Sequence, residues 1–312
     1  MQKIALLQQR ARLVKKIRAF FDTRSYLEVD TPLLGTATNT DIHIQSIRAR
    51  ACNQNLYLQT SPEFAMKRLL AEGSGSIFQI CHAFRDEEKG RRHHPEFTLL
   101  EWYSLGFDYV ALMDQMEQLI NELFGESLSY TRISYFECFQ RYLGLDLQRA
   151  SLYDFRAQVS EHVAGVDVLQ LSQADCMDLL ISQVIGKQFS GFTFVYDYPA
   201  EQASLARISR GNPLVAERFE LFYRDMELAN GFTELTHAAE QRARFEQDNQ
   251  FRAESGLTPY PVDEDFLQAL EQGLPECAGV ALGLDRLLMV LLQLDRLSEV
   301  LVLDTQPVVA GT

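Results

Sequence analysis

The fold class predicted from the sequence is α+β, with an antiparallel β-sheet flanked by helices. Residues 78–103 and residues 218–235 each contain two strand-like runs joined by a charged segment, which is the pattern of a β-hairpin. Residues 278–292 begin as a glycine-containing strand and continue as an apolar helix. Because the two strands of a hairpin pair antiparallel, these three stretches predict the sheet and part of its helical cover.

The elements outside these stretches follow from hydrophobic spacing and turn signals. Residues 4–21 predict an amphipathic helix, because apolar residues recur there at steps of three and four. Residues 55–60 predict a strand, and the helix after it has Ser61 as its N-cap, Pro62 in its first turn and Gly73 at its end. Residues 192–199 predict a further strand.

The composition is that of an ordinary globular protein. The chain has 312 residues, of which 46% are hydrophobic and 23% charged, and its formal net charge is -14. At this length one large domain, or a core with an inserted subdomain, can bury enough apolar surface, and disordered or fibrous classes are excluded. We interpret about residues 111–190 as a helical scaffold or insertion, because few polar groups converge there. A pI near 4.9 means that a polyanion would need a local basic patch.

The cysteines and the apolar stretches indicate a soluble, unexported, cytoplasmic protein. Five cysteines are scattered without CxxC spacing, so we interpret them as reduced thiols, and no HExxH or Cys/His pattern suggests zinc. The first residues are interrupted by charge, unlike a signal peptide. The most apolar stretch, residues 277–294, contains Asp285 and Arg286 and is short for a membrane span.

The first hairpin, residues 78–103, brings chemistry-bearing side chains to a strand face and to a loop. Period-two alternation puts four residues of its second strand on one face, namely Phe97, Leu99, Glu101 and Tyr103. Arg85 is the last residue before the loop, and Glu87 follows two residues later. A buried carboxylate or guanidinium is costly unless it is paired or binds a ligand, so the pattern indicates a binding site. A solvated, charged hairpin is the alternative that the pattern leaves open.

The second hairpin, residues 218–235, suggests a metal site. If Arg224 and Asp225 form its turn, Phe222 pairs with Glu227 and Glu220 pairs with Ala229, so the two glutamates are diagonal neighbours on one face. Two carboxylates at this spacing repel each other unless they share a cation, and hard oxygen ligands favour Mg²⁺. A pair of solvated edge carboxylates is the alternative.

Strand alternation on the second hairpin also requires an irregularity. Regular alternation would put Asn230, Phe232 and Glu234 on the face opposite Glu227. We therefore predict a β-bulge at Gly231 or its neighbour, which would reset the alternation.

The third stretch, residues 278–292, offers an anion site at a helix start. The strand turns at Gly283 into a helix whose first turn carries Asp285 and Arg286. Helix N-termini attract anions, and an arginine there adds a forked donor for phosphate. A core helix with a capping aspartate is the alternative.

Taken together, these segments resemble the motifs of the class II aminoacyl-tRNA synthetases. Arg85 with its acidic loop and the run PEFTLLEWY resembles motif 2, GVALGLDR resembles motif 3, and the first helix with YLEVDTP resembles motif 1. The runs TSPE, RHHPEF and ELANGFTEL narrow the resemblance to the lysyl-tRNA synthetase branch. Within that branch the chain most resembles the stand-alone paralogues that ligate (R)-β-lysine to elongation factor P. The resemblance implies the class II catalytic core and a homodimer formed through motif 1.

The resemblance also implies roles on the ATP side of the site. Arg85 would hold the α-phosphate and the substrate carboxylate, Arg286 would lie over the far end of the triphosphate, and these two arginines would be catalytic. Glu87 would contact adenine and Phe97 would stack on it. Mg²⁺ bridging the phosphates of ATP would be bound by Glu220 and Glu227. The other residues expected to bind ATP are Asp86, His93, His94, Leu228 and Gly283.

On the amino-acid side, the resemblance implies an acidic pocket for a substrate with two amino groups. Glu234 and Tyr103 would surround the ε-ammonium of lysine or (R)-β-lysine. Glu63 and Glu101 would surround the other amino group. The remaining residues expected to bind the substrate are Ser61, Pro62, Asn230, Phe232 and Ala281.

Three departures from the synthetase pattern affect what is expected. Lysyl-tRNA synthetases carry an anticodon-binding domain before this core, and here the chain starts at the helix leading into motif 1, so we expect residues 1–312 to form one catalytic domain and tRNA not to be a partner. Ala281 stands where those synthetases typically have glycine, as in the β-lysine ligases. His94 replaces the usual asparagine, at a position that contacts nucleotide in the family.

The leading hypothesis is thus an ATP-dependent ligase that adenylates (R)-β-lysine and transfers it to a lysine of elongation factor P. A truncated lysyl-tRNA synthetase acting on tRNA is one alternative, and a non-catalytic, synthetase-like amino-acid sensor is another. Such sensors usually lose the arginine of motif 2 or motif 3, and both Arg85 and Arg286 are present.

Overall fold

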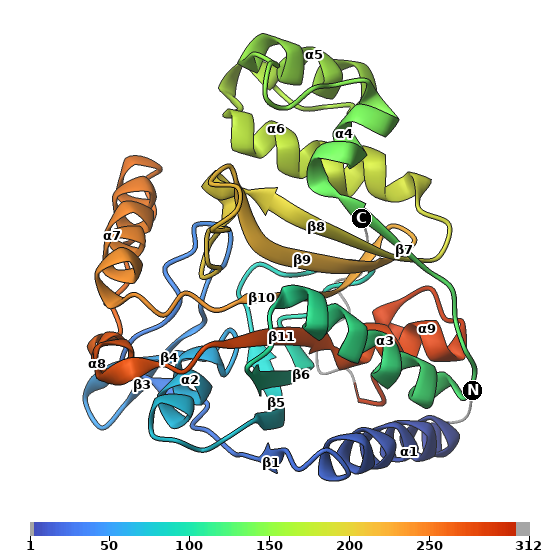
Figure 1. The fold of residues 1–312 in the computed structure, drawn as a ribbon, viewed down its shortest axis with the longest axis vertical. Coiled ribbons are helices and arrows are strands. Elements are labelled where there is room, and N and C mark those ends of the chain that lie inside the picture. Colours follow the sequence, from blue (N-terminus) through green and yellow to red (C-terminus); the bar gives the residue numbers. More distant parts are fainter. Residues whose placement is uncertain (1–2, 304–312) are drawn as a thin grey trace. The chain divides into compact units, whose positions relative to one another are not determined.

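The fold is known from a computed structural model, which describes residues 3–303 in two compact units. The first unit takes in the described residues of Met1–Glu101, Phe245–Phe266 and Leu282–Thr312, and the second comprises Trp102–Arg244 and Leu267–Ala281. Figure 1 labels the elements along the chain. Four elements pass from one unit to the other: β6 (Glu96–Leu105), α7 (Ala238–Glu254), α8 (Glu264–Gly273) and β11 (Cys277–Gly283).

The first unit combines two helices and short strands at its start with the first hairpin and a helix near its end. Its elements are α1 (Lys3–Asp22), β1 (Leu27–Glu28), β2 (Leu34–Gly35), β3 (Arg48–Ala51), β4 (Gln54–Leu58), α2 (Glu63–Ala71), β5 (Ile77–Phe84) and α9 (Leu284–Leu292). β1 pairs with β5 in parallel, and β6 follows β5 in the strand order. β2, β4 and β3 form a separate antiparallel sheet.

The predicted N-terminal helix is confirmed as α1, but its buried face differs from the predicted spacing. Leu6, Leu13 and Ile17 are buried together with the two phenylalanines at the end of the helix. Ile4 and Leu7, two of the residues that predicted the helix, are 65% and 45% exposed. The helix therefore has a second apolar strip, and this strip faces solvent in the single chain.

The second unit is a sheet with a helical segment attached at one edge. Its elements are α3 (Tyr109–Phe124), β7 (Tyr130–Ser134), α4 (Tyr135–Leu143), α5 (Leu152–His162), α6 (Gln173–Leu180), β8 (Phe192–Pro199), β9 (Val215–Tyr223) and β10 (Met226–Thr233). The strand order is β6-β11-β10-β9-β8-β7. β8, β9 and β10 pair antiparallel, but β7 pairs with β8 in parallel. The predicted antiparallel sheet is thus mixed at its edges, because β7 and β8 are joined by a helical crossover, which parallel pairing requires.

The interpretation of residues 111–190 as helical agrees with α3, α4, α5 and α6, although β7 also lies there. α4, α5 and α6 gather beside β7 and β8 around a core of their own (Figure 1). Tyr135 and Phe139 of α4 are fully buried in it, together with Phe155 of α5 and Cys176 of α6. This core includes Tyr198 of β8, so it packs directly onto the sheet strand beside it.

Several predicted boundaries are confirmed and one is corrected. β8 occupies the predicted residues 192–199, and the two hairpins and the strand-to-helix turn at Gly283 are present. The helix predicted to be capped by Ser61 begins later: the N-cap of α2 is Pro62, and Glu63 is its first residue. Ser61 nevertheless serves the helix start, because its Oγ accepts a hydrogen bond from the Glu63 N–H at 3.0 Å.

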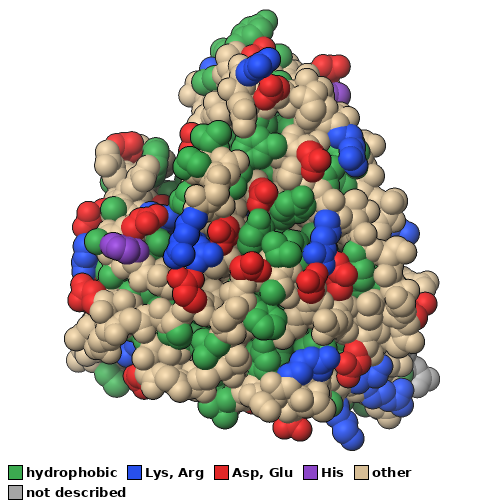
Figure 2. Space-filling view, in the orientation of Figure 1, with side chains coloured by type: hydrophobic (Ala, Val, Ile, Leu, Met, Phe, Trp, Pro, Cys, Tyr) green, Lys and Arg blue, Asp and Glu red, His purple; other side chains and the backbone are tan. Residues whose placement is uncertain are grey.

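The described residues contain no helix long and apolar enough to cross a membrane. The five cysteines are free thiols, and all but Cys52 are buried. Burial raises the pKa of the Cys81 and Cys138 thiols to about 12. On the face shown in Figure 2, acidic and basic side chains are interspersed among hydrophobic ones and do not gather into one basic field.

Candidate active site

Arg85 stands at the end of β5 in the first unit, with donors still available for an anion. Its main-chain N–H donates to the Pro95 carbonyl at 2.9 Å, which fixes the start of the loop. Its Nη1 donates to Glu88 Oε1 at 3.3 Å, and its guanidinium carbon lies 5.1 Å from the centre of the Phe97 ring. Its Nε is buried without a hydrogen-bond acceptor among the described residues. A guanidinium so placed can bind an anion while it stays against an aromatic ring.

The loop after Arg85 is anchored at its first residue and open beyond it. The Asp86 N–H donates to the Gln45 carbonyl at 2.7 Å. The side chains of Asp86, Glu87 and His93 are exposed, and Glu87 has a φ of 64° in the left-handed region. His94 is half-buried, with Nδ1 2.7 Å from the Glu96 carbonyl. The acidic side chains are therefore solvated at the tip, while the arginine at its base is held in place.

Arg286 lies against the same loop. It is in the first turn of α9, and its Nε donates to the Arg92 carbonyl at 3.3 Å. The N-cap of α9 is Gly283, so no side chain caps the start of this helix. Asp285 does not cap the helix, because its carboxylate accepts from the Thr98 N–H at 2.7 Å and from Arg10 Nη1 at 2.5 Å. The capping alternative is thus wrong for Asp285, which instead ties α9 to β6 and α1.

The serine and glutamates predicted to bind an amino group form a hydrogen-bonded set in the first unit. Ser61 Oγ donates to Glu101 Oε2 at 2.8 Å, and Glu101 is only 2% exposed. Glu63 is paired with Lys67, whose Nζ lies 2.6 Å from Glu63 Oε1 and whose side chain is 1% exposed. Lys67 thus partly neutralises Glu63, and the sequence analysis missed this pair although an i, i+4 spacing on a helix indicates it.

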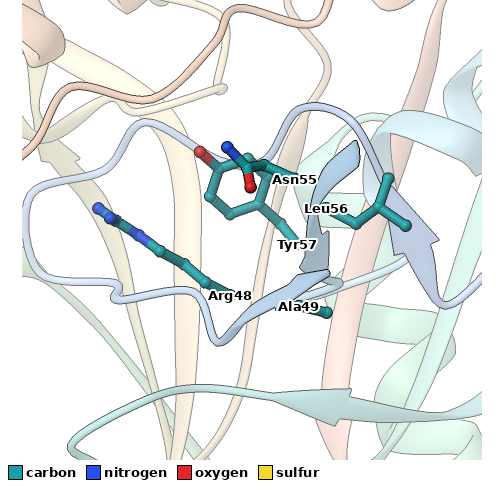
Figure 3. A pocket seen from close by; sticks show the side chains of 5 residues that line it. All are labelled: Arg48, Ala49, Asn55, Leu56 and Tyr57. Atoms are coloured by element: carbon teal, nitrogen blue, oxygen red, sulfur yellow. The ribbon is translucent and has the colours of Figure 1, made fainter. Parts of the chain in front are cut away.

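Two of the cavities in the described part of the first unit differ in whether predicted site residues line them. One of about 160 Å³ is lined by Ser61, Pro62 and Glu63 among others. The other, of about 130 Å³, is lined by residues of the β3–β4 hairpin, including Arg48, Asn55 and Tyr57 (Figure 3). No predicted site residue lines the second cavity.

In the second unit, Glu234 lies in a tightly packed, buried environment. Glu234 is 1% exposed and Tyr103 is 2% exposed. Both side chains pack against Gly279 of β11, because a Cβ added there would lie 2.3 Å from Tyr103 Cε1 and 2.6 Å from Glu234 Oε1. The Glu234 N–H donates to the Cys277 carbonyl at 3.0 Å, which holds the residue after the end of β10. Ala281, two residues beyond Gly279 on β11, is half-buried.

The predicted bulge exists, but it is at Leu228. Phe222 pairs with Glu227 as predicted, and the register then shifts so that Glu220 faces Asn230 instead of Ala229. This shift resets the alternation, and Glu227, Asn230 and Phe232 are the half-buried positions of β10. Gly231 lies in regular register opposite Phe219. Its lack of a side chain allows close packing, because a Cβ there would lie 2.7 Å from both Phe219 and Val280.

Glu220 of β9 is bound by an arginine that the sequence analysis did not single out. Arg218 Nη2 donates to Glu220 Oε1 at 2.6 Å, and the two side chains are 15% and 14% exposed. Burial raises the pKa of the Glu220 carboxyl; Arg218 opposes the rise and Glu227 adds to it. Because Arg218 is two residues before Glu220 on one strand, strand alternation alone placed them on the same face.

The carboxylates of β9 and β10 fit Mg²⁺ that arrives with a nucleotide. Within residues 3–303 no group of three or more His, Cys, Asp or Glu side chains is placed to hold a metal ion. Mg²⁺ is usually bound by one or two carboxylates together with substrate phosphates and water, not by an all-protein cage. Glu220 and Glu227 supply this donor set, and the repulsion between them would be relieved by a shared cation.

Comparison with known proteins agrees with these motifs. The family model described as tRNA synthetases class II (D, K and N) matches residues 2–306. A protein of Pseudoalteromonas translucida named elongation factor P–(R)-β-lysine ligase is 47% identical over 96% of this chain and 95% of its own length. Proteins of the same name from Vibrio cholerae and Edwardsiella ictaluri are 47% and 46% identical, over 95% and 96% of this chain and 94% of their own length. This chain therefore belongs to the class II tRNA synthetase family of the D, K and N type.

Proposed function

We propose that this chain is an ATP-dependent ligase that adenylates (R)-β-lysine and transfers it to the ε-amino group of a lysine of elongation factor P. The observation that carries the proposal is the buried Glu234 carboxylate beside Tyr103, in a chain related over nearly its whole length to ligases of this name. A carboxylate that is 1% exposed is screened from water, so it can form a strong charge-assisted hydrogen bond with the ammonium of lysine or β-lysine.

In the first step, a carboxylate oxygen of the amino acid attacks the α-phosphorus of ATP, and pyrophosphate leaves. Two anions must approach each other, so the reaction needs positioning and charge neutralisation more than proton transfer. Arg85 would hold the α-phosphate and the carboxylate, and Arg286 would hold the far end of the triphosphate. The support is that Arg85 is fixed at its main chain and has a donor without an acceptor, and that Arg286 lies against the same loop.

Mg²⁺ bound by Glu220 and Glu227 would supply charge neutralisation at the phosphates. The other predicted residues of the ATP site would surround adenine and ribose: Asp86, Glu87, His93, His94, Phe97, Leu228 and Gly283. The half-buried Phe97 ring against Arg85 is a surface on which a base can stack. Leu228 would contribute through its main chain, since its side chain is buried at the bulge.

In the second step, the acceptor amine attacks the acyl carbon of the adenylate, AMP leaves and an amide forms. The amine loses a proton on bond formation. A protein amine replaces the tRNA hydroxyl, so no anticodon has to be read. One catalytic domain over residues 1–312, with about residues 111–190 as a scaffold, is enough for this reaction.

The proposal includes a homodimer and a cytoplasmic location. Ile4, Leu7 and Leu27 belong to the predicted motif 1 region and are 65%, 45% and 53% exposed. Large apolar side chains that are exposed in a single chain can be covered in a dimer. The free thiols suit a reducing compartment, where elongation factors act.

The proposal is tested by ATP–pyrophosphate exchange with α-lysine and both β-lysine enantiomers, followed by transfer to elongation factor P and to tRNA. We expect exchange to be fastest with (R)-β-lysine and transfer to be confined to elongation factor P. Transfer to tRNA alone would favour the truncated synthetase. Binding of lysine without exchange would favour the amino-acid sensor.

The acidic pocket is tested separately with Glu234→Gln. We expect this variant to lose exchange by at least about a hundredfold, because a neutral amide cannot pair with the ammonium, while ATP binding measured by calorimetry persists. Glu276→Gln is the matched control, because Glu276 belongs to the same unit but has a side chain that is 57% exposed and ion-paired with Arg207 at 2.5 Å. Unchanged exchange in Glu234→Gln would contradict the role of Glu234.

A further inference from the structure

Arg218 of β9 donates a hydrogen bond from each of its three guanidinium nitrogens. Its Nε donates to Asn230 Oδ1 at 3.2 Å, its Nη1 donates to the Gln202 carbonyl at 2.7 Å, and its Nη2 donates to Glu220 Oε1 at 2.6 Å. The guanidinium carbon also lies 4.4 Å from the centre of the Tyr198 ring. Arg218 cannot rotate to a new partner without losing several contacts at once.

We propose that Arg218 is a positioning residue that couples the metal-binding carboxylate Glu220 to the substrate-pocket amide Asn230. This inference rests on the proposed function, since it concerns the residues to which that function assigns the cation and the amino acid. Arg218 contacts one residue of each group through the same planar fork. A rigid fork transmits the position of one partner to the other, which a flexible lysine cannot do.

The contact with Asn230 fixes which way its amide faces. Asn230 Oδ1 accepts from Arg218, so the Nδ2 donors are directed away from the arginine and remain available for an acceptor on the substrate. Asn230 is directly opposite Glu220 in the β9–β10 register, because the bulge at Leu228 brings it there. The bulge and the arginine therefore act together: one sets the position of Asn230, and the other sets its orientation.

The contact with Glu220 sets the charge of the predicted metal site. Glu220 and Glu227 carry two negative charges, and Arg218 adds one positive charge in contact with Glu220, which leaves a net charge of about -1 when both carboxylates are ionised. One oxygen of Glu220, Oε1, is bound by Arg218. The positive charge of Arg218 thus lowers the affinity of the site for a divalent cation, while its hydrogen bond fixes the position of the Glu220 carboxylate.

Arg218 is in turn held by the helical segment whose role the sequence left open. Gln202, whose carbonyl accepts from Arg218, donates its Nε2 to Asp178 Oδ1 at 2.8 Å. Asp178 belongs to α6, and Tyr135 of α4 packs on the Tyr198 ring beneath the guanidinium, with ring centroids 4.7 Å apart. The segment α4–α6 therefore reaches the predicted metal site through Asp178, Gln202 and Arg218.

The test compares Arg218→Met, which removes charge and donors, with Arg218→Lys, which keeps the charge but loses the fork. The first measurement is lysine binding by calorimetry without ATP or metal. The second is the Mg²⁺ concentration that gives half-maximal pyrophosphate exchange. Arg207→Met is the matched control, because Arg207 also joins a buried glutamate, Glu217, at 2.7 Å in the same unit. Its other ion pair is with Glu276, and neither glutamate is a predicted site residue.

We expect both Arg218 variants to bind lysine about tenfold more weakly, because Asn230 loses its orienting hydrogen bond. We expect Arg218→Met alone to lower the half-maximal Mg²⁺ concentration about two- to fivefold, because the site gains negative charge, while its kcat falls. Arg218→Lys should keep the Mg²⁺ dependence of the wild type. A merely structural role predicts a lower melting temperature with lysine affinity and Mg²⁺ dependence unchanged.

The outcomes separate this inference from the proposed function. Wild-type exchange with none of the three lysines would overturn both. Wild-type exchange combined with unchanged lysine affinity in both Arg218 variants would overturn the inference alone. The same loss of lysine affinity in Arg207→Met would also overturn it, since the effect would then be general to buried arginine pairs.

Discussion

Two arginines, one in each unit, donate hydrogen bonds from all three guanidinium nitrogens, and they show how differently the same side chain is used. Arg218 in the second unit is paired with a carboxylate and contacts two predicted site residues. Arg252 of α7, in the first unit, is 1% exposed and has only neutral acceptors: the Thr258 carbonyl at 3.0 Å, the Asp41 carbonyl at 2.9 Å and Gln45 Oε1 at 2.9 Å. The Tyr260 ring lies 3.9 Å from its guanidinium carbon.

The difference indicates different tasks. A charge paired with a carboxylate changes the local potential, and it acts on whatever ion binds next to it. A charge that binds main-chain carbonyls mainly joins chain segments, because each hydrogen bond holds a stretch of backbone to the guanidinium. Arg252 joins the segment around Asp41 and Gln45 to the residues that follow α7, and Gln45 also accepts the Asp86 N–H through its carbonyl. We therefore expect Arg252 to determine stability and Arg218 to determine ligand binding.

The largest effect on stability is expected for Arg252→Leu. Removing the buried guanidinium breaks three charge-assisted hydrogen bonds that join these segments, which we expect to lower the free energy of unfolding by about 3 to 5 kcal/mol. Urea unfolding measures this loss. Arg24→Leu is the matched control, because exposed Arg24 also binds a main-chain carbonyl, that of Phe20 at 2.9 Å, and lies over a ring at 3.6 Å. The control should lose less than about 1 kcal/mol.

Two results would break the contrast between the arginines. An Arg252→Leu chain no less stable than Arg24→Leu would show that the buried contacts of Arg252 do not hold the segments together. A folded Arg252→Leu protein with a shifted Mg²⁺ dependence would assign to Arg252 the electrostatic role that we give to Arg218.

A second prediction concerns shape instead of charge. Gly279→Ala places a methyl group 2.3 Å from Tyr103 Cε1 and 2.6 Å from Glu234 Oε1, so the carboxylate or the phenol must move. We expect the KM for lysine to rise by at least about tenfold, because displacements of about 1 Å in a binding site have effects of this size or larger. Steady-state pyrophosphate exchange measures it.

The control for Gly279→Ala is Gly191→Ala, also in the second unit, where a Cβ would meet nothing within 4 Å. We expect its KM to equal that of the wild type. Equal KM values for the two alanine variants would mean that the pocket around Glu234 adapts, and that lysine selectivity does not depend on the close packing of Gly279.

The elements that the sequence predicted well are those determined by local patterns. The two hairpins, the strand at residues 192–199 and the turn at Gly283 were predicted from alternation and from glycine positions, and all are present. The family was recognisable because its motifs are short and retain their order along the chain. What local patterns could not give was the position of the bulge, because Leu228 has no turn-forming side chain and the register depends on how the strands pack.

The partners of the charged residues were the other part that the sequence left out. Lys67 with Glu63 and Arg218 with Glu220 follow simple helix and strand spacings, and the sequence analysis could have found both. Arg252 is different, since its acceptors Asp41 and Gln45 are more than 200 residues away along the chain. Main-chain acceptors leave no sequence pattern, so only the folded chain reveals such a contact.

The smallest effect on stability is expected for Ser134→Ala, just before the start of α4. This variant tests whether the segment α4–α6 positions Arg218 or only stabilises the fold. Ser134 and Glu137 form a capping box, with Glu137 Oε2 accepting from the Ser134 N–H at 3.0 Å and from its hydroxyl at 2.9 Å. Loss of this cap should lower stability by about 1 kcal/mol. Ser160→Ala, at an exposed position within α5, is the matched control and should be neutral or slightly stabilising.

The pH dependence of Ser134→Ala gives a further check on the cap. The hydrogen bonds from Ser134 lower the pKa of Glu137, so its contribution is present above the unfolded pKa and is lost as the pH falls through the folded pKa. The stability difference between wild type and Ser134→Ala should therefore shrink in acid. Because α4 contacts the Tyr198 ring through Tyr135 and not through Ser134, we expect the Mg²⁺ dependence to stay unchanged. A changed Mg²⁺ dependence would mean that loosening the helical segment is enough to move Arg218, so that α4–α6 positions the site and does not merely support it.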